Sequence, residues 1–289
     1  TLPFLGDTFE AELERGAITL KRDSVTNSAA LVYYDTAYPL NPGTYAEGKS
    51  IVEIHEAQSW RLMSWREAPK QLSWRRFFEI TGLVGVRVED EAVFADTHRL
   101  ILELVHAGVV DGLRIDHVDG LADPLGYLQR LRAATGPDCY ITVEKILAKG
   151  EQLPPEWPVS GTTGYEFIAS LAEVLVDDSN LSRLETLYDE TLATTVDRQT
   201  ELRKAKGLMT DRNFEGEFTT LLKIASELAG HNGAEVEHED IRHALRELLI
   251  AFPVYRTYGT GEGLTPPDVA LLSRVVASVD TSEPALSLI

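Results

Sequence analysis

Apolar stripes with helical spacing alternate with short apolar runs in the middle of the chain. Apolar positions three and four apart predict a helix over residues 91–106, which ends at Gly108. An apolar run then predicts a strand over residues 109–115, and a second stripe predicts a helix over residues 124–134. Another apolar run predicts a strand over residues 139–146. This succession of helix, strand, helix and strand is typical of parallel βαβ units.

The pattern changes on either side of this unit. Residues 1–50 are broken by Gly and Pro, and short apolar stretches at 17–20 and 30–34 predict strands between the breaks. Helical spacing returns over residues 49–66. The N-terminal segment is therefore expected to be loop-rich and partly β.

The last third of the chain is helical in pattern from residue 167 to residue 250. Residues 252–258 then predict a return to a strand. Thr265 followed by Pro266 is typical of a helix start, with Thr at the N-cap position and Pro in the first turn, and predicts a final helix. The all-α stretch cannot supply barrel strands, so it is interpreted as an insertion.

Charged residues stand at the ends of the two central strands. Arg114 and Asp116 are two apart, so on an extended strand they project to the same side, and Glu144 ends the second strand. A (β/α)8 barrel builds its active site at the carboxyl ends of its strands. Glycosidic-bond chemistry requires a pair of carboxyl groups, one to attack and one to donate a proton. Taken singly, each residue also fits a structural ion pair or a solvated strand end.

The predicted fold class is α/β, part of a (β/α)8 TIM-type barrel with a large all-α insertion. The expected organisation has four segments: a loop-rich, partly β subdomain at residues 1–50, the central part of the barrel at 51–166, the helical insertion at 167–250, and a return to a barrel strand and helix at 251–289.

Composition excludes some classes of partner. The chain has 289 residues, 44% of them hydrophobic, which is enough for a full barrel or two smaller domains. A net charge of −19 argues against nucleic acid or an anionic membrane as a partner. The one cysteine, Cys139, cannot form an internal disulfide. No apolar run has the length of a membrane span and no signal peptide precedes Thr1, so a cytoplasmic protein is expected, although the absence of a first Met leaves the natural start open.

Three motifs in the middle of the chain are specific in combination. They are Gly-Leu-Arg-Ile-Asp-His-Val-Asp-Gly-Leu-Ala-Asp-Pro at 112–124, Val-Glu-Lys-Ile-Leu at 143–147, and Trp-Pro-Val-Ser-Gly-Thr-Thr-Gly-Tyr-Glu-Phe at 157–167. With these motifs the sequence resembles the maltooligosyltrehalose synthases of the α-amylase superfamily (glycoside hydrolase family 13). Residues 75–78, 85–90 and 252–258 also match, so the resemblance runs from about residue 58 to residue 258.

The resemblance implies that Asp116 is a nucleophile, that Glu144 is the acid/base, and that Arg114 keeps Asp116 ionised, since an adjacent cation lowers a carboxyl pKa. It implies no metal and no cofactor. The residues expected to bind substrate are Trp74, Arg76, Phe77, His117, Asp119, Lys145, Trp157, Thr163 and Tyr165.

The sequence also departs from the family pattern. Ser73 and Trp74 stand where relatives more often have Asn and Tyr. The superfamily's third carboxylate and its early Asp/Asn/His motif are absent, and by their place in the family they are expected after residue 289 and before residue 1, respectively.

The function that the resemblance implies is an intramolecular transglucosylation. The terminal α-1,4 linkage at the reducing end of a maltooligosaccharide would become an α,α-1,1 linkage, as in trehalose, by a retaining double displacement. Two alternatives remain open: an α-1,4-glucan hydrolase with the same carboxyl groups, and an incomplete fragment that binds glucan without turning it over. The expected partners are the glucan and, for a fragment, the remainder of the parent chain.

Overall fold

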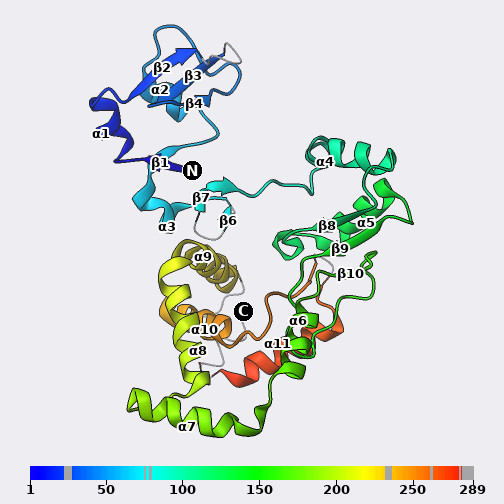
Figure 1. Ribbon diagram of the computed structural model, residues 1–289. Helices are drawn as coiled ribbons and strands as arrows, with labels where there is room; N and C mark the ends of the chain where they lie inside the picture. Colours follow the sequence, from blue (N-terminus) through cyan, green and yellow to red (C-terminus); the bar gives the residue numbers. More distant parts are fainter. Residues whose placement is uncertain are drawn as a thin grey trace. The chain divides into compact units, whose positions relative to one another are not determined.

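The computed structural model describes the chain except for residues 23–27, 75, 78–79, 232–235, 261–262, 280 and 282–289 (Figure 1). The chain divides into two compact units. The first unit contains Thr1–Gly85 and Lys206–Leu245, and the second contains Val86–Ala205 and Arg246–Ser282. Within the described residues, no helix combines the length and the apolar character needed to cross a membrane.

The N-terminal part of the first unit contains short strands and short helices. In chain order they are β1 (Leu2–Leu5), α1 (Phe9–Glu14), β2 (Ile18–Arg22), β3 (Ala29–Tyr33), β4 (Thr36–Pro39), α2 (Ile51–Glu56), β5 (Leu62–Ser64), the 3-10 turn η1 (Trp65–Glu67), α3 (Ala68–Gln71), β6 (Arg76–Phe77) and β7 (Ile80–Val84).

An antiparallel meander, β2-β3-β4, organises this part of the unit. The two strands predicted at 17–20 and 30–34 are confirmed as β2 and β3, which pair from Ile18 opposite Tyr33 to Arg22 opposite Ala29. Every second residue of such a strand faces the core. The buried side chains of this core are Leu5, Phe9, Ile18, Tyr33, Tyr38 and Leu62.

The helix predicted over residues 49–66 is wrong beyond its first half. Helix α2 begins with a capping box between Ser50 and Glu53 and ends at Glu56. Strand β5 follows because it pairs in parallel with β1, placing Leu62 opposite Leu2. Pairing with a strand about sixty residues earlier decides the conformation here, and local helical spacing contains no information about such a partner.

The remaining part of the first unit is helical. It contains the end of α8 (Arg198–Leu208), the π-helical turn η4 (Met209–Asn213), α9 (Glu215–His231) and most of α10 (His238–Ala251). The apolar face of α9 packs against α10 through Phe218, Leu222, Ala225, Ala229, Ile241 and Leu245.

The second unit contains the predicted βαβ elements and several others. Its elements are α4 (Glu91–His106), β8 (Gly112–Ile115), the 3-10 turn η2 (Val118–Gly120), α5 (Pro124–Thr135), β9 (Tyr140–Val143), β10 (Gly161–Thr162), α6 (Tyr165–Leu175), the 3-10 turn η3 (Asp178–Asn180), α7 (Leu181–Leu192) and α11 (Pro266–Ser278), together with the start of α8 and the end of α10.

Strands β8, β9 and β10 form a three-stranded parallel sheet in the order β10-β9-β8. The helices predicted at 91–106 and 124–134 and the strands between them are confirmed. Gly112 permits the close approach of the two strands, because a Cβ there would lie 2.7 Å from the backbone oxygen of Tyr140. Among the described residues this sheet does not close into a barrel, so the barrel remains an expectation.

Helices α4 and α5 cover the parallel sheet. Their core with the sheet comprises Phe94, Val118, Tyr127, Leu128, Leu131, Ile141, Val143 and Trp157. His98 on α4 is buried in this layer, where its ring nitrogens contact the Phe94 carbonyl oxygen at 3.0 Å and the Tyr127 hydroxyl at 2.8 Å. Burial lowers the pKa of His98, so the ring is a neutral core residue.

Residues 252–258 were predicted to form a strand, and this prediction is wrong. The segment after α10 is irregular, and its residues are fixed by side-chain contacts described below. The final helix, by contrast, starts as predicted, because the Thr265 side chain accepts a hydrogen bond from the Asp268 backbone N–H.

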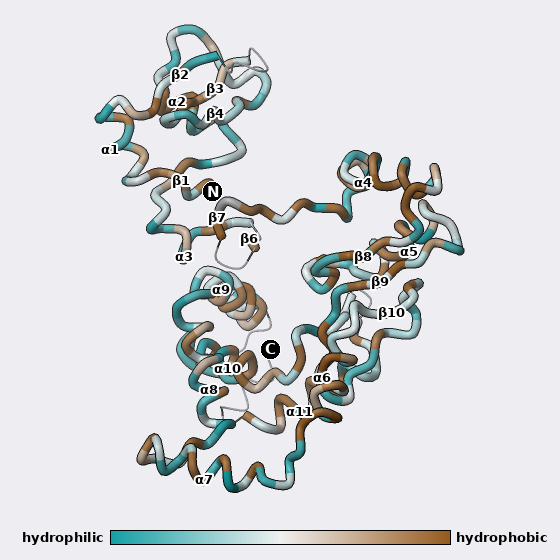
Figure 2. Tube along the Cα trace, in the orientation of Figure 1, coloured by the Kyte–Doolittle hydropathy of each residue, from teal (hydrophilic) through white to brown (hydrophobic). Residues whose placement is uncertain are grey.

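Helix α6 has apolar side chains that are exposed among the residues that the structure describes. Figure 2 shows α6 as one of the most hydrophobic segments of the trace. Ile168 is 63% exposed and Val174 is 81% exposed. An apolar stripe on a helix normally packs against another element, so this face is a surface that neighbouring elements would cover.

Candidate active site

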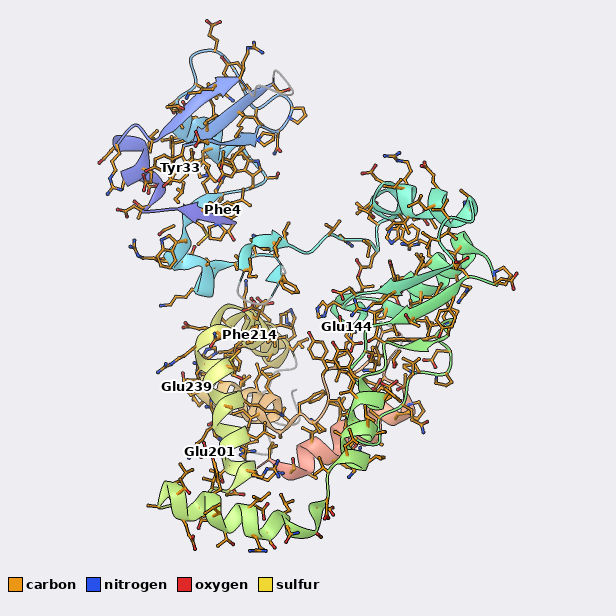
Figure 3. All side chains as sticks on the ribbon, in the orientation of Figure 1. Phe4, Tyr33, Glu144, Glu201, Phe214 and Glu239 are labelled. Atoms are coloured by element: carbon orange, nitrogen blue, oxygen red, sulfur yellow. The ribbon has the colours of Figure 1, made fainter. Side chains whose placement is uncertain are left out.

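The two carboxylates at the strand ends share one guanidinium. Asp116 follows β8 and Glu144 follows β9, and both strands run in the same direction. Arg114 on β8 donates from Nη1 to Asp116, and its Nη2 lies 3.5 Å from Glu144 Oε1. Asp116 is the most open of the three side chains, at 65% exposure, and Glu144 is 23% exposed (Figure 3 labels Glu144). The predicted catalytic residues are therefore neighbours at one edge of the sheet.

A tight turn after Asp116 links it to Glu144. His117 has the left-handed conformation, with φ 47°, and its backbone N–H donates to Glu144 Oε2 at 2.8 Å. Gly120 has no side chain in the space beside the His117 ring, since a Cβ there would lie 2.3 Å from His117 Cδ2. The His117 ring itself is exposed and meets Tyr255 edge to face at 6.1 Å between centroids. The turn thus fixes Glu144 through the backbone and leaves the imidazole accessible.

Lys145 lies beneath this turn, away from solvent. Its side chain is 0% exposed, and its Nζ lies 2.7 Å from Glu151 and 3.4 Å from Asp119. Lys145 and Asp119 remain predicted to contact substrate; in the structure Asp119 is 9% exposed and the two side chains pair with one another. A buried cation with two carboxylate partners orders the loops after β8 and β9.

Two residues from a distant segment complete this network. The Tyr258 hydroxyl donates to Asp119 Oδ1, and Arg256 Nη1 donates to the Asp119 carbonyl oxygen at 3.0 Å. Arg256 also donates to the Leu121 carbonyl oxygen. The irregular segment before α11 is thereby attached to the loop that carries the nucleophile candidate.

Periodicity did not identify Glu151, Arg256 or Tyr258 as site residues. The signal that could have found the last two is the family motif at residues 252–258, where an Arg and two Tyr stand close together. Glu151 has no such signal, since it is one acidic residue in a polar loop.

The loop after β9 provides the remaining candidates. Trp157 was predicted to stack on sugar, and this stays a prediction; its side chain is 5% exposed and packs edge to face against Tyr258 at 5.2 Å. Thr163 has a buried hydroxyl without a hydrogen-bond partner among the described residues. Tyr165, the first residue of α6, is 38% exposed. Thr163 and Tyr165 remain predicted substrate-binding residues.

The aromatic cluster that precedes the parallel strands in sequence belongs to the first unit. Trp74 is half-buried, and its indole N–H donates to the Thr1 carbonyl oxygen. Phe77 on β6 is 45% exposed. The side chain of Arg76 lies outside the described part of the structure. All three remain predicted to bind substrate.

The surroundings of Arg114 and Tyr258 shift the pKa values of these two side chains. The hydrogen bond to Asp116 raises the pKa of Arg114 further, so its positive charge persists at every working pH. Burial and the neighbouring Asp119 raise the pKa of Tyr258, which therefore remains a proton donor. Within the described residues, no group of three or more His, Cys, Asp or Glu side chains is arranged to hold a metal ion.

An exposed aspartate and a partly buried glutamate at the ends of adjacent parallel strands are the groups needed for retaining chemistry at a glycosidic bond. The Arg114 guanidinium contacts both of them. Enzymes that act on glycosidic bonds commonly use such a pair of carboxyl groups.

Comparison with known proteins gives the chain a more particular likeness. It is 44% identical over 155 residues to proteins of two Mycobacterium tuberculosis strains named putative maltooligosyl trehalose synthase, a match that covers 54% of this chain and 20% of the relative. The solved maltooligosyltrehalose synthase of Arthrobacter ramosus superposes with a TM-score of 0.79 at 34% identity, covering 99% of this chain and 35% of that one. A hypothetical maltooligosyl trehalose synthase of Sulfolobus tokodaii gives 0.71 at 28% identity, covering 99% and 34%.

The predicted resemblance to maltooligosyltrehalose synthases is confirmed by these relatives. No family model matches the chain. The chain spans about a fifth of the length of the curated relatives and about a third of the solved structures, which is consistent with a fragment.

Proposed function

We propose that this chain is the central part of an enzyme that rearranges the reducing end of a maltooligosaccharide into a trehalose unit. The observation that carries the proposal is the guanidinium of Arg114 in contact with both Asp116 and Glu144 at the ends of adjacent parallel strands. The likeness to maltooligosyltrehalose synthases supports the choice of substrate.

In the first step, an Asp116 oxygen attacks the anomeric carbon of the sugar next to the reducing end. The bond from that carbon to the reducing-end glucose breaks, and Glu144 gives its proton to the departing oxygen. Arg114 supports this division of roles, because it donates a hydrogen bond to Asp116 and lies farther from Glu144, at 3.5 Å, so its charge stands nearest the proposed nucleophile.

In the second step, the released glucose turns over in the site. Its anomeric hydroxyl attacks the same carbon, Glu144 removes the proton from that hydroxyl, and Asp116 leaves as a free carboxylate. The product has an α,α-1,1 linkage and the same atoms as the substrate. The His117 backbone N–H keeps one Glu144 oxygen fixed through both steps.

Water competes with the glucose for the covalent intermediate. Hydrolysis of α-1,4-glucan is the outcome when the acceptor is poorly held, and it uses the same two carboxyl groups. We propose rearrangement rather than hydrolysis because this chain is similar to proteins named maltooligosyltrehalose synthases.

The open sheet supports a further part of the proposal. Strands β8 and β10 are the two edges of the described parallel sheet, and the chain covers only 35% of the Arthrobacter relative. We therefore expect turnover only in a longer chain that supplies further strands and a third carboxylate. The isolated chain is proposed to bind glucan weakly.

The test follows reducing-end content and free glucose over time with maltopentaose, using the 289-residue chain and a version extended at both ends. Loss of reducing ends without free glucose is expected for the extended chain. Asp116→Asn should lower its rate at least about 1,000-fold, since it removes the nucleophile while preserving the shape of the side chain. A rise in reducing ends would instead identify a hydrolase, and turnover by the short chain would refute its proposed incompleteness.

A further inference from the structure

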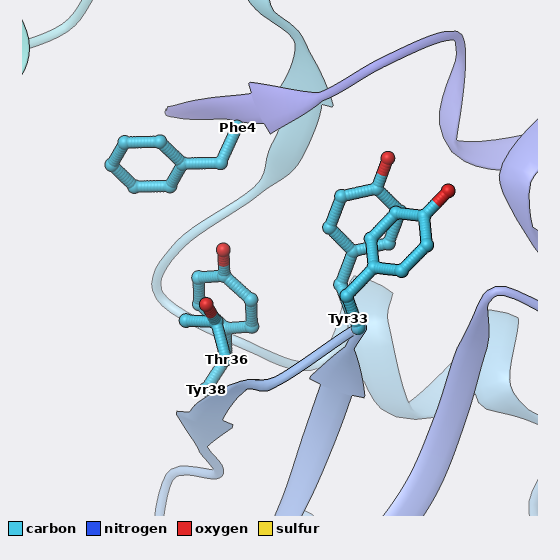
Figure 4. Close-up of a pocket in the computed structure, with 5 residues that line it drawn as sticks. Phe4, Tyr33, Thr36 and Tyr38 are labelled. Atoms are coloured by element: carbon cyan, nitrogen blue, oxygen red, sulfur yellow. The ribbon is translucent and has the colours of Figure 1, made fainter.

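An aromatic hollow in the first unit is not used by the candidate active site. It has a volume of about 360 Å³ and is lined by Phe4, Tyr33, Tyr34, Thr36 and Tyr38 (Figure 4). This volume lies within the range of roughly 300–1,000 Å³ that is usual for ligand sites. All five residues come from β1 and the β3–β4 hairpin, so the hollow is formed by local structure.

The chemistry of the lining is that of aromatic faces with hydroxyl groups. None of the five side chains is charged at neutral pH. The Phe4 and Tyr38 rings are nearly parallel, at 26°, with centroids 6.3 Å apart, and Tyr33 and Tyr34 meet edge to face. A charged ligand would find no counter-charge in this lining. A pyranose ring fits it, because its C–H face packs against aromatic faces while its hydroxyls need donors and acceptors at the edge.

Tyr38 offers a hydroxyl to the hollow. The residue is 8% exposed, so its ring is buried, but its hydroxyl oxygen is not one of the fully buried unpartnered atoms of the described residues and is therefore accessible from the hollow. Figure 4 shows this hydroxyl on the side of the hollow that faces Phe4. By contrast, the Tyr33 hydroxyl accepts the Gly6 backbone N–H at 3.0 Å. A tyrosine with a buried ring and an accessible hydroxyl can pack against an apolar surface and donate a hydrogen bond to the same ligand.

Tyr34 occupies a position where the backbone favours glycine. It begins the two-residue turn between β3 and β4 with a φ of 50°, and its ring is 71% exposed at the rim of the hollow. A bulky residue with positive φ is a strained choice for a hairpin turn. Strain of this kind is associated with functional positions, and here it presents an aromatic ring to solvent.

We propose that this hollow is a second binding site for α-glucan, which holds one or two sugar rings of the chain by stacking on Phe4 and Tyr34 and by hydrogen bonds to Tyr38 and Thr36. The choice of an α-linked glucan rests on the proposed function. The evidence that a binding site exists here is the geometry of β1 and the β3–β4 hairpin, which does not depend on the proposed function. Its expected dissociation constant is on the order of 1 mM, since few atoms of the ligand are enclosed.

The test titrates the intact 289-residue chain, labelled on its 10 tyrosines, with maltoheptaose and follows the tyrosine ring signals by NMR. Saturable shifts of the Tyr34 and Tyr38 signals are expected. Tyr38→Phe removes only the hydroxyl and breaks no hydrogen bond within the described structure, so the fold should be unchanged. It should weaken binding roughly three- to tenfold, and Phe4→Ala should weaken it by at least as much.

Tyr34→Gly makes the test sharper, because the thermal stability should be kept or increased while the affinity for maltoheptaose should decrease. Glycine relieves the positive φ, so the midpoint of thermal unfolding should stay constant or rise. Binding should nevertheless fall roughly three- to tenfold with the loss of the ring. Tyr188→Ala is the matched control, since Tyr188 is a similarly exposed tyrosine on α7, at 57%, and its loss should leave the affinity unchanged.

Two outcomes would overturn the proposal: no saturable shift of Tyr34 and Tyr38, or wild-type affinity in all three hollow variants. Loss of the shifts in the extended chain would do the same, because the hollow would then be covered by the parent protein. The outcome is independent of the proposed reaction. If the extended chain rearranges maltopentaose while the hollow stays empty, only this inference fails; if the hollow binds maltoheptaose without any rearrangement, only the proposed reaction fails.

Discussion

The two sheets of this protein differ in how much of each is built from nearby residues. The antiparallel meander β2-β3-β4 lies within 22 consecutive residues, from Ile18 to Pro39, and adjacent strands follow each other in sequence. The parallel sheet β10-β9-β8 extends from Gly112 to Thr162 and needs α5 and a long loop between its strands. The first sheet forms from hairpins, whereas the second requires crossover connections.

The difference extends to the sites that the two sheets form. The aromatic hollow takes all its residues from the first 38 positions of the chain. The candidate active site takes its carboxylates from two strand ends and is stabilised by Tyr258, which is 139 residues from its partner Asp119. Local sequence can therefore form a hollow, whereas the contacts that support the pair of carboxylates need residues that only the fold brings together.

The largest loss of stability is expected when Lys145, the buried cation between the loops after β8 and β9, is replaced. Lys145→Met leaves Asp119 and Glu151 without their positive partner in the interior, so the second unit should lose about 3–5 kcal/mol of unfolding free energy. Urea unfolding combined with hydrogen exchange of the β8 and β9 amides measures this loss. Lys149→Met, at an exposed lysine four residues further on, is the matched control and should change stability by less than about 0.5 kcal/mol. A loss as small as the control's would mean that the network does not stabilise the sheet.

Acid should destabilise the first unit through protonation of His55. Burial, and secondarily Arg61, lower the pKa of His55 to about 4, and its Nε2 accepts the Leu62 backbone N–H at 2.9 Å. The unfolded chain takes up a proton at about pH 6.5, whereas the folded chain does so only near pH 4, so stability should fall as the pH drops through that window and level off below it. The loss attributable to His55 is at most about 3 kcal/mol.

The measurement is urea unfolding between pH 7.5 and pH 3.5, with His55→Gln as the variant that removes this titration. Its stability should depend less on pH between about 6.5 and 4 than that of the wild type. Equal slopes for the two proteins would contradict the assignment of the acid sensitivity to His55.

A smaller effect is expected from the contact that joins the distant segment to the nucleophile loop. Tyr258→Phe deletes the hydrogen bond to Asp119 while keeping the ring against Trp157, and should cost about 1–3 kcal/mol. Because Tyr258 and Lys145 share Asp119, the double variant with Lys145→Met should lose less than the sum of the two single losses. Additive losses in this cycle would show that the two contacts are independent.

The smallest effect is expected at the helix caps, where the two units should behave alike. Ser50 caps α2 in the first unit and Asp90 caps α4 in the second, each accepting backbone N–H groups of the first turn. Ser50→Ala and Asp90→Ala should each cost about 1 kcal/mol, because capping is local in both. Chemical denaturation of both variants tests this. Losses that differ by more than about 1 kcal/mol would show that tertiary context alters even this contribution.

Much of the second unit could be predicted because its elements carry strong local patterns. Helix α4 has the bounds that its apolar spacing predicts, and the strand ends carrying Asp116 and Glu144 were identified from the change of apolar to charged residues. Residues 62–64 and 252–258 were predicted incorrectly for one reason: their conformation depends on partners far away in the sequence. The barrel and the four-segment division remain predictions.

The sequence by itself determined the central helices and strands, where the two candidate catalytic carboxylates stand, and which family the chain resembles. These features depend on side-chain periodicity and on motifs, which are local. Only the tertiary structure decided that Lys145 and Trp157 are interior residues, that Arg256 and Tyr258 support the site, and that the Tyr38 hydroxyl is accessible from an aromatic hollow. Burial and pairing are relations between distant residues, so no window of sequence contains them.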